Sequence, residues 1–94
     1  MEYYKDNPKL FEENAAILKA IAHPVRLCIV KGLLQRGPSN VTSMHSCLGM
    51  PQSTISQHLS NLKKANVIEG DRQGLEVFYR VSNKKVKKII EVMF

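Results

Sequence analysis

Residues 52–64 carry a run of short polar side chains that can form hydrogen bonds at close range. Ser, Thr and Gln both donate and accept, which suits the edges of DNA bases and the oxygens of phosphates. An ordinary solvated helix face favours long charged side chains instead. Gln57 is a good candidate for binding adenine, because the Gln amide matches the adenine edge in the major groove. The candidate contacts in this run are Gln52, Ser53, Thr54, Ser56, Gln57 and Ser60.

The alternative is that these residues merely cap a helix and solvate its surface. Ser and Thr are common at helix N-termini, where they accept from free backbone N–H groups. Capping accounts for Ser53 or Thr54, but it does not account for the polar side chains of the following two turns. We therefore favour contact with a groove of DNA. The residues then expected to contact phosphates are Lys63, Lys64, Arg72 and Gln73.

The charge of the chain favours a polyanionic partner. The 94 residues include 14 Lys and Arg against 8 Asp and Glu, giving a formal net charge of +6 and a pI near 9.6. Residues 1–22 hold three Lys and four acids, whereas residues 23–94 hold eleven basic and four acidic side chains. The positive charge is therefore concentrated in the same part of the chain as the polar run.

The length and composition indicate a single globular domain over residues 1–94, because so short a chain forms one hydrophobic core. No apolar run approaches the roughly 20 residues needed to cross a bilayer, so no membrane partner is expected. The chain opens without an apolar signal segment and has two cysteines, which favours a cytoplasmic location. No catalytic triad and no Gly-rich phosphate loop is recognisable, so we expect no enzymatic activity.

The polar run needs elements to position it, and the periodicity of apolar residues predicts them. Helices are expected at about 8–21, from 24 to a stop at Gly37 and Pro38, from Asn40 to a turn at Gly49, from 51 to 65 and at about 83–94. Two β-rich runs, 67–72 and 75–81, are separated by Gln73 and Gly74 and predict a hairpin. A sharp turn at Gly49 joins the third and fourth helices. The expected fold is mainly α with a small β-hairpin, a dimeric winged helix-turn-helix of order ααααββα.

Three segments resemble the ArsR/SmtB family of bacterial winged-helix repressors, and within it a PagR-like subgroup. They are IAHPVRLCIV, LGMPQSTISQHLSNLKKANVI and DRQGLEVFYRVS, and the similarity extends over about residues 10–94. The resemblance implies a homodimer built by the first and last helices. It also implies an operator of double-stranded DNA with imperfect twofold symmetry, and repression of transcription from a nearby promoter.

The apolar pattern of the last helix supports a dimer independently of that resemblance. Its apolar residues recur at helical spacing opposite four Lys, at the end of a chain too short to cover them easily. The alternative is that this helix simply covers its own domain. The residues expected in the dimer interface are Leu10, Phe11, Ile17, Leu18, Val86, Ile89, Ile90 and Met93.

The family resemblance suggests two places for a metal, the start of the third helix and the last helix. This sequence lacks the ligands for both sites. The family's paired cysteines fall on Asn40 and Thr42, and the last helix has no His and only Glu91 as an acid. We expect no metal and no cofactor. His23 is expected to cap the second helix, and His58 to make a supporting hydrogen bond where the fourth helix meets the wing.

Cys28 and Cys47 are the redox candidates. We expect both to be small buried core residues, as free cysteines often are. The alternative is that the sulfur of Cys28 is accessible, since the family position between Leu27 and Ile29 is often polar. Oxidation would then bias the dimer between DNA-competent and incompetent states.

A function of a different class is a winged helix used only for protein contact. Such a module would carry apolar anchors on the outer face of residues 52–64. The sequence places none there, which favours DNA as the partner.

Overall fold

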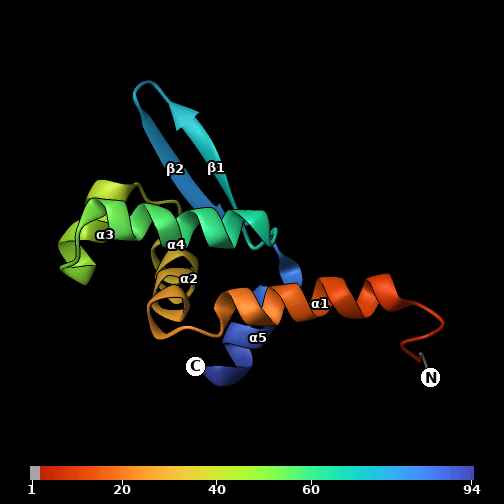
Figure 1. The fold of residues 1–94 in the computed structure, drawn as a ribbon. Coiled ribbons are helices and arrows are strands. Elements are labelled where there is room, and N and C mark those ends of the chain that lie inside the picture. The colour runs from red at the N-terminus through yellow and green to blue at the C-terminus, as the bar shows by residue number, and fades with distance from the viewer. Residues whose placement is uncertain (1–2) are drawn as a thin grey trace.

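The computed structural model describes residues 3–94 and has the element order that the sequence predicts (Figure 1). Its elements are α1 (Pro8–Ile21), α2 (Pro24–Arg36), α3 (Val41–Leu48), α4 (Gln52–Lys64), β1 (Ile68–Gln73), β2 (Glu76–Val81) and α5 (Lys84–Met93). The order of four helices, an antiparallel hairpin and a last helix confirms the mainly α winged helix-turn-helix fold, ααααββα.

Side chains cap the N-termini of α1, α2, α3 and α5. The Nδ1 atom of His23 accepts a hydrogen bond from the backbone N–H of Val25 at 3.1 Å, which confirms the predicted capping role of that histidine. Asn residues act in the same way before the other three helices, with their Oδ1 atoms accepting from first-turn N–H groups. Local capping chemistry therefore fixes where these helices begin.

The core is formed by apolar side chains from every helix and from the first strand. The largest fully buried side chains are Ile55, Leu59, Leu62, Ile68, Val30, Val67 and Val86. Three of these seven belong to α4, which therefore has one face firmly held in the interior. Removing such side chains from water is the main stabilising contribution to the fold.

The hairpin turns one residue later than the sequence analysis predicted. Gln73 pairs with Glu76, so the two-residue loop is Gly74–Leu75 and not Gln73–Gly74. Gly74 has φ +66°, and hairpin loops of two residues commonly require a left-handed residue at the first loop position. Leu75 is 99% exposed at the tip. The sequence analysis assigned it to the second strand because it is apolar, and that assignment was wrong.

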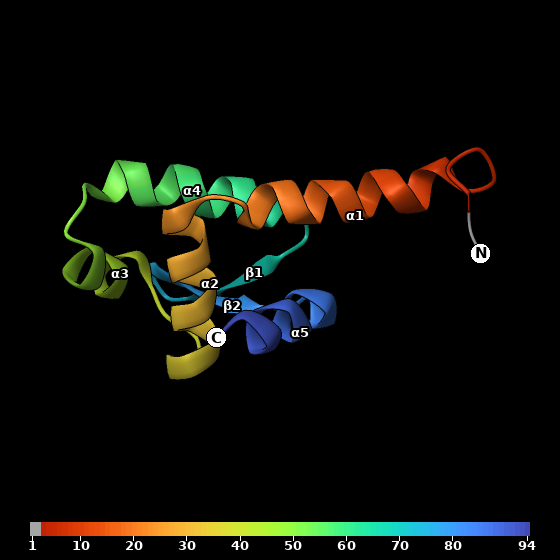
Figure 2. The same ribbon diagram turned by 90° about the horizontal axis from the view of Figure 1, so that it is seen from below.

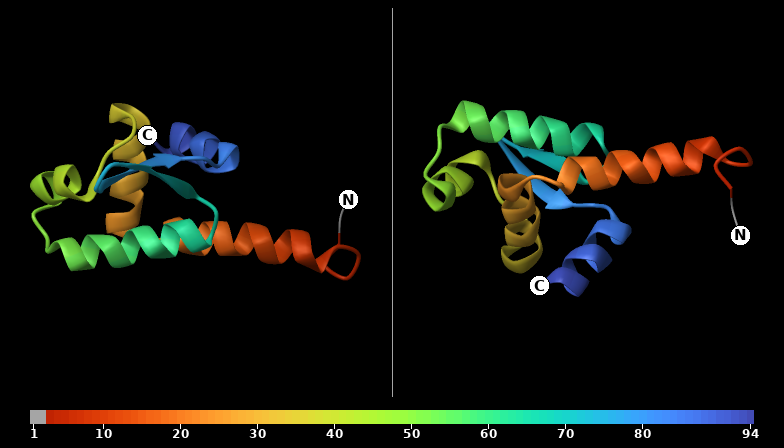
Figure 3. Two further views of the ribbon diagram at one scale, coloured as in Figure 1. Left: turned by 90° about the horizontal axis from the view of Figure 1, so that it is seen from above. Right: turned by 60° about the horizontal axis from the view of Figure 1, so that its bottom comes forward.

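The elements are arranged so that the hairpin projects from one side of the molecule and α5 lies on the opposite side, near α2 (Figure 1). The C-terminal end of α1 meets α2 and the second half of α4, while the N-terminal part of α1 extends away from the rest (Figures 2 and 3). The molecule is accordingly elongated, measuring 45 × 27 × 20 Å. One end of α1 is thus held by the core, and the other stands free of it.

Two residues expected in a dimer interface lie instead in the core of the single chain. Val86 is 0% and Ile90 is 5% exposed, so α5 packs one face on its own domain, as the alternative interpretation held. The prediction for these two residues was wrong because one helical stripe can serve either purpose. Ile89 is half-buried and Met93 is exposed.

Truncation of the α4 anchor should destabilise the whole domain. Ile55 is fully buried, and Ile55→Ala removes its methylene groups and leaves a cavity. We expect the free energy of unfolding to fall by about 2 to 5 kcal/mol in urea titrations followed by circular dichroism. The control Leu75→Ala changes a side chain at the exposed hairpin tip and should stay within about 0.5 kcal/mol of the wild type. Similar losses in both variants would contradict this account of the core.

Candidate nucleic-acid interface

α3 and α4 form the helix-turn-helix. Gly49 ends α3 in the left-handed conformation, with φ +67° and ψ 22°, and so allows the chain to turn sharply towards α4. His45 reinforces this turn, since its Nδ1 donates to the carbonyl of Met50 at 2.6 Å. The two helices pack against each other, and α4 is held with its buried stripe inward. The turn therefore fixes which face of α4 is outward.

The outward faces of α4 carry the polar residues that the sequence singled out. Thr54 is half-buried, and the other expected contacts in this helix are exposed. The exposed members are Gln52, Ser53, Ser56, Gln57, Ser60, Lys63 and Lys64. Asn61 is exposed beside them. The structure thus brings these residues onto one solvent-facing helix and turns only Thr54 partly inward.

The N-terminus of α4 begins without the Ser or Thr cap considered above. Its N-cap residue is Pro51, and no side chain within residues 3–94 accepts a hydrogen bond there. Ser53 and Thr54 therefore do not act as caps. The backbone N–H of Thr54 donates to the carbonyl of Pro51 at 3.1 Å. The N–H groups of Gln52 and Ser53 and the positive end of the helix dipole favour an external anion such as a phosphate.

The wing is defined here as residues 68–81, and its two arginines differ in their surroundings. The guanidinium of Arg80 donates to Asp71 at 3.0 Å and to Glu69 at 2.6 Å, and these carboxylates raise its pKa, Asp71 most strongly. Arg80 is therefore compensated within the wing. Arg72 and Gln73, the predicted wing contacts, are both exposed near the tip.

A cluster of three side chains attaches α4 to the start of α2. Nη1 of Arg26 donates to Nδ1 of His58 at 3.3 Å, and the rings of His58 and His23 lie 4.7 Å apart. The supporting hydrogen bond of His58 therefore exists, but it joins α4 to α2 and not to the wing as predicted. Desolvation lowers the pKa of His58, and the nearby His23 and Arg26 lower it further.

Both cysteines are exposed, so the prediction that they are buried core residues was wrong. Cys28 directly precedes the buried Ile29, and one step along a helix turns a side chain by about 100°, which sequence periodicity resolves poorly for small residues. Cys47 lies three residues after Met44, which is the buried residue of the short helix α3. In the part of the chain from 3 to 94, no three His, Cys, Asp or Glu side chains gather closely enough to hold a metal ion.

Apolar side chains remain exposed on α1 and near the C-terminus. Phe11 is 40% and Leu18 is 54% exposed, and Leu10 and Ile17 are half-buried. The exposed apolar set also includes residues that the sequence analysis missed, namely Tyr3 and Tyr4 before α1, and Val92 and Phe94 beside the predicted Met93. Val92 lies outside the apolar stripe of α5, so the spacing of apolar residues did not predict it as part of an apolar surface.

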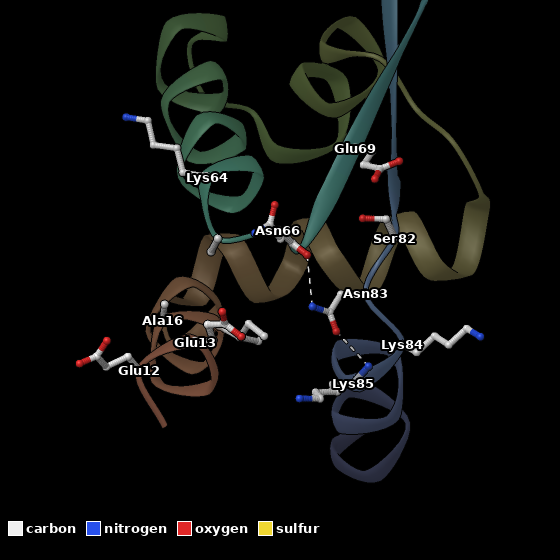
Figure 4. A pocket seen from close by; sticks show the side chains of 12 residues that line it. Glu12, Glu13, Ala16, Lys64, Asn66, Glu69, Ser82, Asn83, Lys84 and Lys85 are labelled. Atoms are coloured by element: carbon white, nitrogen blue, oxygen red, sulfur yellow. Dashed lines mark hydrogen bonds between the residues drawn. The ribbon is translucent and has the colours of Figure 1, made fainter. Parts of the chain in front are cut away.

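A pocket of about 790 Å³ lies between α1, the end of α4 and the start of α5 (Figure 4). Its lining mixes acids such as Glu12 and Glu13 with bases such as Lys64 and Lys84. Asn83 donates from Nδ2 to the carbonyl of Asn66 at 3.2 Å, which ties the start of α5 to the end of α4. No His or Cys lines this pocket, so it offers no such nucleophile or base. The pocket lies where the three elements meet, and we assign it no chemical role.

Comparison with known proteins places these features in a family. Residues 21–71 match a family model described as a helix-turn-helix domain. The transcriptional repressor PagR of Bacillus anthracis is 44% identical over 82 residues, which make up 87% of this chain and 82% of PagR. The transcriptional repressor SmtB of Mycobacterium tuberculosis is 35% identical over 82 residues, or 87% of this chain and 60% of SmtB. The chain belongs to the ArsR/SmtB family.

Solved structures of ArsR/SmtB-type proteins agree with the fold. The crystal structure of PagR matches with a TM-score of 0.86 at 41% identity, covering 94% of this chain and 100% of that chain. A homodimeric winged helix-turn-helix DNA-binding domain of a possible ArsR-family regulator from Mycobacterium bovis matches with a TM-score of 0.84 at 27% identity, covering 99% and 85%. The predicted membership of ArsR/SmtB, with its PagR-like character, is confirmed. Among residues 3–94, the structure has no helix with the length and apolar character that crossing a membrane requires.

The His58 cluster should make stability depend on pH. Because the pKa of His58 in the folded chain lies below its usual value of 6.5, the unfolded chain binds more protons there as the pH falls. This contribution to the free energy of unfolding is complete above about pH 6.5 and is lost as the pH drops through the lowered pKa. We expect urea titrations at pH 7.5 and pH 5.5 to differ less for His58→Asn than for the wild type. Gln57→Asn, at the neighbouring exposed position, should keep the wild-type difference. An unchanged difference in His58→Asn would contradict the assignment.

Proposed function

We propose that this chain is a homodimeric, sequence-specific DNA-binding transcriptional regulator, a repressor whose α4 lies in the major groove. We call α4 the recognition helix. The observation that carries the proposal is the division of this helix into a fully buried apolar stripe and outward faces of short polar side chains. A fold that anchors one face of a helix so firmly leaves the opposite faces free for the edges of base pairs.

The outward residues match the chemistry of the major groove. That groove is about 12 Å wide and admits one helix, so short side chains reach base edges only if the helix lies deep in it. Gln57, in the second turn of α4, would pair with adenine through its amide. Gln52, Ser53, Ser56 and Ser60 would contact bases or nearby phosphates. Thr54 is half-buried and would contribute less.

Phosphate contacts would come from the ends of the recognition helix and from the wing. The uncapped N-terminus of α4 favours a phosphate at one end, and Lys63 and Lys64 would meet the strand at the other. In the wing, Arg72 and Gln73 are the better candidates, because two carboxylates already compensate the charge of Arg80. These contacts would fix the position of the helix without reading sequence.

The dimer would be built by α1 and the end of α5. Leu10, Phe11, Ile17, Leu18, Ile89 and Met93 supply apolar area outside the fully buried core. The similar M. bovis domain is described as homodimeric, which supports the same assembly here. A twofold dimer would present two recognition helices to half-sites about one helical turn apart, and so favour an imperfectly palindromic operator.

We further propose that repression needs no metal effector and that the protein acts in the cytoplasm without catalysing a reaction. The family's paired-cysteine positions hold Asn40 and Thr42, whose side chains are poor ligands for soft metals. A role in protein contact alone is less well supported, because the outward faces of α4 carry no large apolar anchor.

Loss of the Gln57 amide should relax sequence preference. A duplex selected from a random pool by the wild type would be compared with a scrambled duplex in titrations at fixed salt. We expect Gln57→Ala to reduce the discrimination between them by about 1 to 3 kcal/mol, because a bidentate base contact is lost. The matched control is Gln35→Ala, which removes the same amide from an exposed position on α2 and should leave discrimination unchanged.

Arg72→Ala provides the contrast, since it should weaken both duplexes alike and lower the salt slope by about 1. If the wild type bound the two duplexes with equal affinity, its binding to DNA would be nonspecific. No retention of either duplex at low salt would refute it.

Charging the exposed apolar face of α1 should separate the dimer. Leu18 is 54% exposed, and Leu18→Glu would place a carboxylate in the proposed interface. We expect a monomer in sedimentation equilibrium and loss of operator binding, with a circular dichroism spectrum like that of the wild type. Leu75→Glu introduces the same charge at the hairpin tip and should remain dimeric. A Leu18→Glu protein that sediments like the wild type would exclude this interface.

A further inference from the structure

A narrow pocket between α2 and α3 brings both cysteines to one place. Its volume is about 170 Å³. Cys28, Gly32 and Arg36 line it from α2, and Ser43 and Cys47 line it from α3. Apolar residues of the same two helices and Ser39 from the loop between them complete the lining. The two sulfur-bearing residues thus belong to opposite walls of one small opening, and both are exposed.

The surroundings of Cys47 favour reaction at sulfur. Nη1 of Arg36 donates to Sγ of Cys47 at 2.7 Å. Reactive cysteines are typically found in such electropositive, accessible surroundings. A structural cysteine would instead be buried among apolar groups. Cys47 is therefore the better candidate for the first reaction with an oxidant.

Gly32 keeps the pocket open between the two cysteines. It lies in the interior of α2, where Gly costs about 1 kcal/mol relative to Ala. A Cβ atom built at Gly32 would meet nothing within 4 Å, so no close contact in the chain requires the missing side chain. The consequence of having Gly at this position is free space in the lining of the pocket.

We propose that Cys28 and Cys47 form a hydroperoxide-responsive thiol pair that regulates DNA binding. The proposal rests on the proposed function, since DNA binding is the activity that would be regulated. In the first step the sulfur of Cys47 attacks hydrogen peroxide, forming an S–O bond, breaking the O–O bond and releasing water. In the second step the sulfur of Cys28 attacks the resulting sulfenic acid, forming the disulfide and releasing a second water. The two thiols lose two electrons and two protons, and the peroxide is reduced to water.

The disulfide would alter the position of the helix-turn-helix. Cα atoms joined by a disulfide usually lie about 4.4 to 6.8 Å apart, so the bond would hold α2 and α3 at that separation across the pocket. α3 would move towards α2, and α3 packs directly on α4. The recognition helix would then lose the orientation set by the reduced core. Oxidation should therefore weaken binding to the operator, and a reductant should restore it.

The test combines intact mass with DNA binding on the 94-residue chain. The wild type, Cys28→Ser, Cys47→Ser and the double variant are treated with hydrogen peroxide and then measured without reductant. We expect the wild type alone to lose the mass of two hydrogen atoms while remaining one chain on a denaturing gel. Its affinity for the selected duplex should fall by about 5- to 150-fold, and dithiothreitol should reverse the loss. The double variant should bind equally with and without peroxide.

Several outcomes would overturn the proposal. These are addition of oxygen without loss of hydrogen, a disulfide between two chains, or an internal disulfide with unchanged affinity. Arg36→Gln should slow the loss of free thiol, and Lys31→Gln, a charge change elsewhere on α2, should not. If the reduced wild type binds no duplex at all, the proposed function fails. The mass measurement would still decide whether the thiol pair exists.

Discussion

The burial of the α4 stripe is the constraint on which the rest of the structure depends. Ile55, Leu59 and Leu62 are at most 2% exposed, and each contributes roughly 1.5 to 3 kcal/mol by leaving water. The same packing decides the orientation of the helix, because side chains on one stripe fix the direction of all the others. Stability and the proposed recognition of DNA would therefore depend on the same packing. A change that loosens the stripe would also rotate the outward face that we propose binds DNA.

Much of the fold was predictable because local chemistry determines it. The helices are capped by local residues, namely Asn7, His23, Asn40 and Asn83, and Gly49 allows the sharp turn into α4. The hairpin register depended on a single turn. A loop at Gln73–Gly74 would shift every cross-strand pair, so the sequence analysis could not predict that Glu69 pairs with Arg80. In the structure, carboxylates compensate the charge of Arg80.

The candidate site was predictable as a face but not in its supporting contacts. Helical periodicity separates the buried stripe of α4 from its outward faces, yet it does not resolve Thr54, which is half-buried at the edge. The partner of His58 proved to be Arg26, which is 32 residues away in the chain. The outward direction of Cys28 and Cys47 also depends on how α2 and α3 approach each other. Contacts between elements distant in sequence leave no local pattern.

Apolar side chains remain exposed on α1 and around Met93 and Phe94. If they join two copies, promoter occupancy would depend on the concentration of the protein. Copies held together by this surface would be in equilibrium with single chains, and at low abundance the concentration of pairs would rise with the square of the concentration of free chains. Promoter occupancy would then change more steeply than synthesis itself. Isolated copies would also expose Phe11 and Leu18 to solvent and be prone to nonspecific association.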